Sequence, residues 1–180
     1  DIILAVMIHR ISEQKGFQLL LESSEGIFKN LNFQLIAGGS VSAGDNRGEA
    51  IAHGLYLLSQ YFPDKCHVSF GYQDVSIPLL SCDFFLMPSM HEPGGISQLE
   101  AMAAGCPVIA RATGGLRDTI KPVSGSGRSA EGCGFLFYDF SPWSFYDAME
   151  RASSFFKNSD DETFAVLREN AEKAAYFWDK

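Results

Sequence analysis

The residues best suited to chemistry lie in the stretch HEPGGISQLE, residues 91–100. It carries two carboxylates, Glu92 and Glu100, with a proline and two glycines between them. Gly94 and Gly95 permit close backbone approach to a ligand and leave N–H groups exposed where a helix begins, which is a favourable place for a diphosphate. Glu92, just before the glycines, is placed to accept hydrogen bonds from sugar hydroxyls. The stretch therefore predicts a site for a phosphorylated sugar.

Glu100 has two interpretations. The sequence SQLE, residues 97–100, matches a capping box, in which Ser97 caps the helix and Glu100 reaches back to a free backbone N–H. The alternative is a role in ligand binding beside Glu92. The two roles need different side-chain directions, and the pattern alone does not separate them.

Two cations lie in HRISEQKGF, residues 9–17, after a predicted strand. Arg10 and Lys15 precede a helix that is predicted to begin at Gly16, and two cations near a helix N-terminus make a strong anion site. The alternative is an ordinary solvated loop with surface charges. Position after a strand favours the anion site.

Two further stretches follow predicted strands. Tyr72 ends FGY, where its ring would cover a nucleotide base or serve as a plain packing residue. In ATGGLRDTI, residues 112–120, Thr113, Gly114 and Gly115 either present N–H groups to a ligand or form a simple glycine turn. Because such turns gather at one edge of a parallel sheet, together they favour one shared site.

Several classes of site are poorly supported. AGGS, residues 37–40, lacks the GxGxxG spacing, and no acidic residue closes the second strand to hold a ribose, which argues against a nicotinamide dehydrogenase. The four histidines lack metal-binding spacing, although His9 and His91 follow strands and are candidates to line the cleft. The four cysteines form no CxxC pair, so we expect reduced core thiols in a reducing compartment.

The elements that must position these residues alternate between apolar β-type runs and stretches of helical period, the order of βαβ units. We predict strands at residues 2–8, 33–37, 67–70, 83–87, 107–110 and 134–138, and helices at 16–28, 48–61, 76–81, 97–104, 115–120, 142–157 and 161–174. Strands that are apolar on successive residues indicate a sheet covered on both faces. The prediction is an α/β fold with a Rossmann-like, doubly wound parallel sheet of about six strands, whose ligands bind at the carboxyl ends of the strands.

The composition of the chain limits the kinds of fold and partner that we expect. A chain of 180 residues with 46% hydrophobic residues is expected to form one domain. Its net charge of -8 argues against nucleic acid or an anionic membrane surface as a partner, and no apolar run reaches the roughly 18 residues of a membrane span. The Gly- and Ser-rich residues 124–134 predict a mobile surface loop, and the aromatic stripe at 143–156 predicts a helical packing face.

Taken together, the motifs resemble the C-terminal, nucleotide-sugar-binding domain of retaining GT-B glycosyltransferases, most closely the glycogen and starch synthase family. RISEQKG resembles that family's arginine and lysine turn, and residues 83–120 resemble its signature block. The resemblance implies that residues 1–180 are the donor-nucleotide-binding half of a GT-B fold. The start within a strand and the end at YFWDK suggest an excised domain. The acceptor-binding N-terminal domain and the crossover helix would then be missing, and Trp178 is expected to be partly exposed.

The resemblance also implies a role for each candidate residue. Arg10 and Lys15 would neutralise the donor diphosphate and stabilise the leaving nucleotide, and Glu92 would bind hydroxyls of the donor glucose. Glu100 would be the second carboxylate of the E-x7-E motif, assigned to the ribose, and Tyr72 would lie against the base. The remaining donor-binding residues would be Gly94, Gly95, Ile96 and Ser97, through backbone N–H groups that hold the phosphates, with Thr113 and Gly114.

The implied reaction is elongation of an α-1,4-glucan from ADP-glucose or UDP-glucose, with no metal and no cofactor. The glucan acceptor would be bound by the missing N-terminal domain, and the expected location is the cytoplasm, or a plastid in a plant or alga. Two departures matter: synthases typically have a cysteine where this chain has Gly94 and a non-acidic residue where it has Glu100. Another retaining hexosyltransferase, or a non-catalytic binding module of the same fold, is therefore the alternative.

Overall fold

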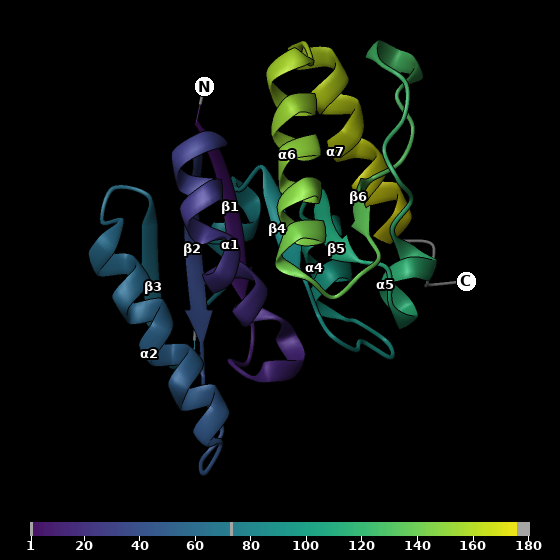
Figure 1. Ribbon diagram of the computed structural model, residues 1–180. Helices are drawn as coiled ribbons and strands as arrows, with labels where there is room; N and C mark the ends of the chain where they lie inside the picture. Colours follow the sequence, from purple (N-terminus) through teal and green to yellow (C-terminus); the bar gives the residue numbers. More distant parts are fainter. Residues whose placement is uncertain (1, 73, 176–180) are drawn as a thin grey trace.

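The computed structural model describes residues 2–72 and 74–175, and its strands form one all-parallel sheet in the order β3-β2-β1-β4-β5-β6. The strands are β1 (Ile3–Ile8), β2 (Phe33–Gly39), β3 (Cys66–Phe70), β4 (Phe84–Met87), β5 (Val108–Arg111) and β6 (Gly134–Phe137). Their carboxyl ends point downward in Figure 1. The predicted six-stranded, doubly wound sheet is confirmed, and the expectation for Trp178 falls outside the described residues.

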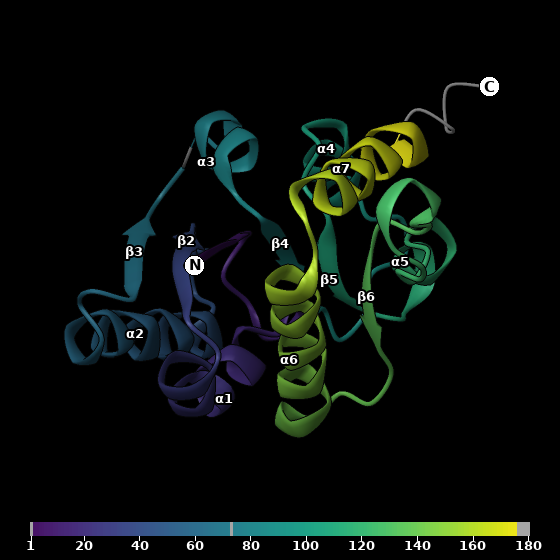
Figure 2. The same cartoon turned by 90° about the horizontal axis from the view of Figure 1, so that it is seen from above.

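Helices cover both faces of this sheet. They are α1 (Phe17–Asn30), α2 (Asn46–Tyr61), α3 (Ser76–Ser81), α4 (Ser97–Ala103), α5 (Gly114–Thr119), α6 (Pro142–Asn158) and α7 (Asp161–Ala175). Figure 2 shows α1, α2 and α6 on one face and α3, α4, α5 and α7 on the other. Each predicted helix and strand is present within about two residues of its predicted ends. Two short 3-10 helices, η1 (Glu13–Lys15) and η2 (Gly127–Ser129), are additional.

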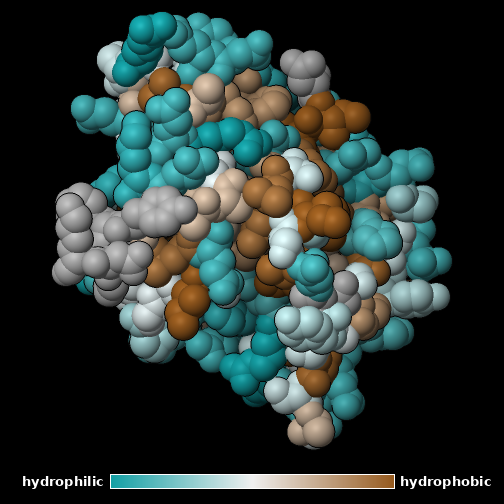
Figure 3. Space-filling view, turned by 180° about the vertical axis from the view of Figure 1, so that it is seen from behind, coloured by the Kyte–Doolittle hydropathy of each residue, from teal (hydrophilic) through white to brown (hydrophobic). Residues whose placement is uncertain are grey.

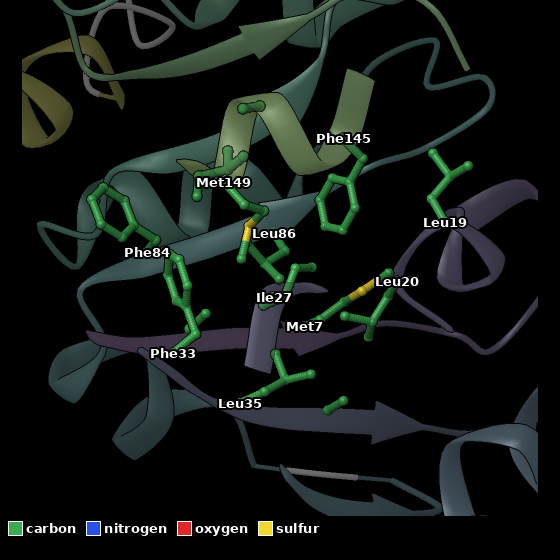
Figure 4. Packing of buried hydrophobic residues seen from close by; sticks show 14 of the residues in the cluster. Met7, Leu19, Leu20, Ile27, Phe33, Leu35, Phe84, Leu86, Phe145 and Met149 are labelled. Atoms are coloured by element: carbon green, nitrogen blue, oxygen red, sulfur yellow. The ribbon is translucent and has the colours of Figure 1, made fainter. Parts of the chain in front are cut away.

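The core follows from strands that are apolar on both faces. In β1, Ile3, Ala5 and Met7 belong to the cluster under α1 and α6, whereas Val6 belongs to the cluster on the opposite face. Figure 4 shows the first cluster, in which Met7 of β1 lies beside Leu20 of α1 and Leu86 of β4 lies beside Met149 of α6. Full burial of each large apolar side chain contributes about 1.5–3 kcal/mol, so the sheet is a rigid platform for the loops at its edge.

The opposite face is covered less completely. Helix α3 has six residues, and two of its apolar side chains, Ile77 and Leu80, are exposed. Ile36 of β2 lies on this side and is only partly buried. Figure 3 shows apolar side chains gathered near the middle of this face.

The loop at residues 124–134 lies on the surface, as predicted, contains η2 and contacts α7. The N–H of Gly127 donates to Thr163 Oγ1 at 2.7 Å, and Arg128 Nε lies 2.6 Å from Glu162 Oε1. The Gly and Ser content here serves tight turns whose polar groups are hydrogen-bonded to a neighbouring helix.

The four cysteines are free and buried, as predicted. Burial raises the pKa of the Cys66 thiol to about 12 and also raises the pKa of Cys106 and Cys133. These thiols are therefore packing groups and not nucleophiles. Among the described residues, no cluster of His, Cys, Asp and Glu has the geometry of a metal site, and no described helix is long and apolar enough to cross a membrane.

Candidate functional site

The candidate site lies where β1 and β4 are neighbours in the sheet. From this point, the chain after β1 turns into α1 on one face, and the chain after β4 turns into α4 on the other. The space outside the carboxyl ends of these two strands, the crevice in which doubly wound sheets bind their ligands, is therefore the candidate site. Both motifs with candidate charges, HRISEQKG and PSMHEPGG, follow these two strands.

The two motifs are joined directly. The N–H of Met90 donates to the carbonyl oxygen of Gln14 at 2.8 Å, and Gln14 Nε2 donates to the carbonyl oxygen of His91 at 2.9 Å. Gly16 has φ 79°, and a Cβ there would lie 2.1 Å from the carbonyl oxygen of Pro88. Only glycine fits this position, so the turn after β1 and the loop after β4 form one backbone-to-backbone assembly.

Lys15 and Glu92 meet across this junction. Lys15 Nζ lies 2.6 Å from Glu92 Oε2, and the Ser89 hydroxyl donates to the same oxygen at 3.2 Å. The side chains of Lys15 and Glu92 are 15% and 11% exposed. No hydrogen bond within residues 2–72 and 74–175 involves Glu92 Oε1, so one oxygen of this carboxylate holds the lysine and the other is available to a ligand.

Arg10 differs from Lys15 in its surroundings. It follows β1 directly, is exposed and makes no ion pair with any residue that the structure describes. The Lys15–Glu92 pair carries no net charge, whereas Arg10, in the same turn after β1, has no ion-pair partner among the described residues.

His9 lies beneath the site, not in it. It is 6% exposed, its Nε2 is 2.8 Å from the Leu86 carbonyl oxygen, and its ring contacts Phe85 edge-on at 5.0 Å. Desolvation by burial lowers the pKa of His9 from 6.5 to about 4. The ring is therefore neutral near pH 7, and Nε2 donates to the carbonyl. The prediction that His9 lines the cleft is wrong, whereas His91 is exposed.

The third glycine turn is part of the same assembly. The N–H of Gly115 donates to the Glu92 carbonyl oxygen at 3.0 Å, and a Cβ on Gly114, which has φ 46°, would lie 2.2 Å from that oxygen. Thr113 is the partly buried N-cap of α5 and makes no side-chain cap. The turn after β5 thus holds the loop that carries Glu92, and the Gly115 N–H is used within the protein.

The N–H groups of residues 94–97 have different surroundings. Gly94 and Ile96 are exposed, Ser97 is partly buried, and Gly95, at φ 66°, is buried against Gln98. None of these four N–H groups donates a hydrogen bond to another described part of the chain. They form a short run of free donors next to Glu92.

The capping-box prediction is wrong. Helix α4 begins at Ser97 with Ile96 as its N-cap, and no side chain caps it. Ser97 is therefore one position too far along the chain to cap the helix. Glu100 is exposed on the first turn, on the α4 side of the crevice, and its role in ligand binding stays a prediction.

Tyr72 stands at the far end of the same edge, beyond β3. Its side chain is 97% exposed, so the packing interpretation is wrong. The N–H of Gly71 donates to the Gly39 carbonyl oxygen at 3.0 Å, which fixes the backbone just before the ring. The ring is free to lie against a planar group.

Three residues of the site were missed by the motif analysis: Gln14, Ser89 and Arg111. Arg111 Nη1 donates to the Met90 carbonyl oxygen at 2.7 Å, and Arg111 Nε donates to the Tyr138 carbonyl oxygen at 3.0 Å. Gln14 and Arg111 thus hold the Glu92 loop from two sides. Their partners lie 77 and 21 residues away in the sequence, and no local pattern indicates such contacts.

Comparison with known proteins identifies the family of the chain. The model of the family Glycosyl transferases group 1 matches residues 2–174. The chain is 38% identical over 176 residues to a glycogen synthase of Desulfitobacterium hafniense, covering 97% of this chain and 36% of that protein. It is 33% identical over 182 residues to a glycogen synthase of Kosmotoga olearia, covering 100% of this chain and 36% of that protein. The chain thus spans about a third of the length of these relatives.

Among solved structures, the catalytic domain of starch synthase IV from Arabidopsis thaliana, bound to ADP and acarbose, is similar with a TM-score of 0.78. The identity is 26%, over 99% of this chain and 37% of that one. Sucrose-phosphate synthase from Thermosynechococcus elongatus shares the fold, with a TM-score of 0.74 at 24% identity, over 98% of this chain and 41% of that one. On the family match and the shared Rossmann-like GT-B half, this chain belongs to the group 1 family of glycosyl transferases.

Proposed function

We propose that residues 1–180 are the donor-binding domain of a retaining glucosyltransferase that elongates an α-1,4-glucan from ADP-glucose or UDP-glucose. The observation that carries the proposal is the Lys15–Glu92 pair at the crevice between β1 and β4, with Arg10 uncompensated beside it. The names of the relatives, glycogen synthase and starch synthase, support the choice of glucan. The acceptor would bind to a part of the enzyme outside this chain.

The chemistry follows from where charge develops. When the bond between the anomeric carbon and the diphosphate oxygen breaks, negative charge grows on the leaving phosphate, and fixed cations and N–H dipoles stabilise it most where water is excluded. Arg10 and Lys15 supply the positive charge in this proposal, and the free N–H groups of residues 94–97 supply the dipoles. No metal is needed when two cations carry this charge.

Glu92 has a double role in this account. Its Oε2 accepts from Lys15 and Ser89, which fixes the direction of the carboxylate, and its Oε1 accepts from hydroxyls of the donor glucose. A carboxylate held by two donors inside the protein presents its second oxygen in a fixed position. Sugar orientation and diphosphate neutralisation are therefore coupled through one ion pair.

The outer parts of the nucleotide would meet the remaining predicted residues. Tyr72 lies against the base, and Glu100 binds the ribose hydroxyls from the first turn of α4. Thr113 and Gly114 line the side of the donor pocket formed by the turn after β5. Four free cysteines and bacterial relatives support the cytoplasm as the location, with a plastid as the alternative in a plant or alga.

Calorimetric titration of the chain with ADP and with UDP tests the proposal. We expect one of them to bind and to stabilise the folded chain by RT ln(1 + [L]/Kd), about 2.7 kcal/mol at a hundred-fold excess over Kd. Comparing ADP-glucose with UDP-glucose then identifies the donor. Absence of binding and of a thermal shift with both nucleotides at millimolar concentration would overturn the proposal.

A second candidate is a retaining hexosyltransferase with a different acceptor. Gly94 and Glu100, which depart from the synthase pattern, favour it. Transfer assays with the full-length protein separate the two, because only the glucan synthase lengthens maltooligosaccharides. A full-length protein that binds nucleotide but transfers no sugar would indicate a non-catalytic module.

A further inference from the structure

A groove of about 890 Å³ lies on the outer surface between α1 and α6. These helices are side by side at the front of Figure 1. Two aromatic rings line the groove: Trp143, which is 78% exposed, and Tyr146. Their planes are inclined by only 21°, with ring centroids 6.2 Å apart. The groove therefore presents most of the Trp143 side chain to solvent, with the ring of Tyr146 beside it.

The helical period of α6 explains why the ring of Trp143 lies outside the core. Phe145, Ala148 and Met149 are buried against the core, as the packing-face prediction for residues 143–156 requires. Trp143 and Tyr146 are three residues apart, a spacing that places both on the same side of a helix. Trp143 is exposed, whereas Tyr146 is partly buried and packs against the edge of the core. The packing interpretation is thus correct for most of the stripe and wrong for Trp143.

Helix α1 is shaped to receive the Tyr146 ring. Gly26 lies in the middle of α1, where a glycine costs about 1 kcal/mol relative to alanine. A Cβ at Gly26 would lie 2.9 Å from the ring of Tyr146, and the amide of Asn30 lies 3.5 Å from the Tyr146 hydroxyl. The glycine makes room for the ring at one side of the groove.

The charges of the groove limit what it binds. Three carboxylates line it, from Glu22, Glu25 and Glu150, and its single lining cation, Lys29, is paired with Glu25. Excess negative charge disfavours nucleotides, nucleic acids and other anions. Carboxylate oxygens accept hydrogen bonds from hydroxyl groups, and flat rings pack against the C–H face of a pyranose. These features together fit a neutral, polyhydroxylated ligand.

We propose that the groove between α1 and α6 is an accessory site that binds a stretch of glucan through Trp143 and Tyr146. The choice of glucan over other neutral oligosaccharides rests on the proposed function. The donor crevice is formed by the carboxyl ends of β1 and β4, whereas the groove lies on the outer face of two helices. The site would hold the polymer on the enzyme while a chain end reacts elsewhere.

Titration of the chain with maltoheptaose, followed by calorimetry and tryptophan fluorescence, tests this proposal. We expect binding by the parent chain, at least ten-fold weaker binding by Trp143→Ala, and a smaller loss for Glu150→Ala. Tyr61→Ala is the matched control, because Tyr61 is 74% exposed on α2 and lies outside the groove. It should bind maltoheptaose like the parent chain. Trp143→Phe retains an aromatic ring and should recover part of the affinity.

Absence of maltoheptaose binding at millimolar concentration would overturn the proposal, as would equal affinity of the parent chain and a folded Trp143→Ala variant. Binding of a lysine-rich peptide in place of maltoheptaose, again dependent on Trp143, would indicate a basic protein partner and would also overturn it. ADP and UDP titrations of the same variants separate the two sites. Nucleotide binding without glucan binding would support the proposed function and overturn the accessory site. Glucan binding without nucleotide binding would support a glucan site in the groove and overturn the proposed function.

Discussion

The carboxyl edge of the sheet and the groove between α1 and α6 differ in how firmly the rest of the domain fixes them. At the edge, three turns touch backbone to backbone, and the Lys15–Glu92 pair is mostly buried. In the groove, the principal side chain, Trp143, is mostly exposed. Charge stabilisation in a reaction needs groups in fixed positions away from water. Holding a flexible polymer requires only an accessible surface, so substitutions in the groove should change binding without changing stability.

The largest expected effect is at Gly16. Gly16 and Gly44 both have φ 79°, but a Cβ at Gly16 would clash with Pro88, whereas Gly44 has open space around it. We expect Gly16→Ala to lower the free energy of unfolding by about 3 kcal/mol or more, and Gly44→Ala by about 1–2 kcal/mol, from φ strain alone. Urea unfolding measures both. Equal losses would show that the edge is not rigidly packed.

The next effect concerns His9 and pH. The pKa of His9 is about 4 in the folded chain and 6.5 in the unfolded chain. Between these two values the unfolded chain binds more protons, so the free energy of unfolding falls as the pH falls. From pH 7 to pH 5, His9 should cost about 2 kcal/mol.

Urea unfolding of the parent chain and of His9→Gln at both pH values isolates this contribution. The variant should lose less stability than the parent chain on acidification, because it has no imidazole to protonate at position 9. Parallel pH profiles would mean that His9 is not held neutral beneath the site.

The ion pair at the edge gives the third effect. Lys15→Met and Glu92→Gln, separately and together, should reveal a coupling free energy of about 1–2 kcal/mol, because both side chains are mostly buried. The same cycle for the exposed pair Lys173–Glu169 on α7 should give a value close to zero. A coupling near zero for Lys15 and Glu92 would remove the basis for treating them as one unit.

Glu100 gives the smallest effect on stability. Since it caps no helix, Glu100→Ala should change the free energy of unfolding by less than about 0.5 kcal/mol. If it binds the ribose, the variant loses affinity for ADP or UDP and keeps its affinity for inorganic pyrophosphate. Calorimetry with these ligands checks both statements. An equal loss of affinity for pyrophosphate would contradict the ribose role and would indicate that Glu100 acts at the phosphates.

Much of the fold could be predicted because its signals are local. Apolar runs such as FFLM and helical periods such as that of α6 identify the elements, and their alternation predicts the parallel sheet. The sequence also predicts that Arg10, Glu92 and Gly114 lie at the same edge of the sheet, because each of them comes after a predicted strand. These features depend on residues close together in the sequence.

The features that could not be predicted depend on long-range contacts or on a shift of one residue. Lys15 and Glu92 are 77 residues apart, so their ion pair has no sequence signal. The prediction of a capping box was wrong because the N-cap of α4 is Ile96 and not Ser97. Trp143 was assigned to a packing face because its residue type does not show which side of the first turn of α6 it occupies. The loop at residues 124–134 was predicted from its composition, which does not reveal its partners on α7.

The central claim is that cations at the crevice between β1 and β4 bind the diphosphate of a nucleotide-sugar. Arg10→Ala tests it most directly, because Arg10 is exposed and makes no ion pair within the described residues. Arg128→Ala is the matched control, since Arg128 lies in η2 beside the start of α7, at the other end of the sheet (Figure 1).

Calorimetric titration of both variants with ADP, UDP and pyrophosphate is the measurement. We predict that Arg10→Ala folds with an unchanged Tm and binds the diphosphates at least ten-fold more weakly, a loss of about 1.4 kcal/mol. Arg128→Ala should bind like the parent chain. Unchanged diphosphate affinity in Arg10→Ala, or an equal loss in Arg128→Ala, would contradict the account.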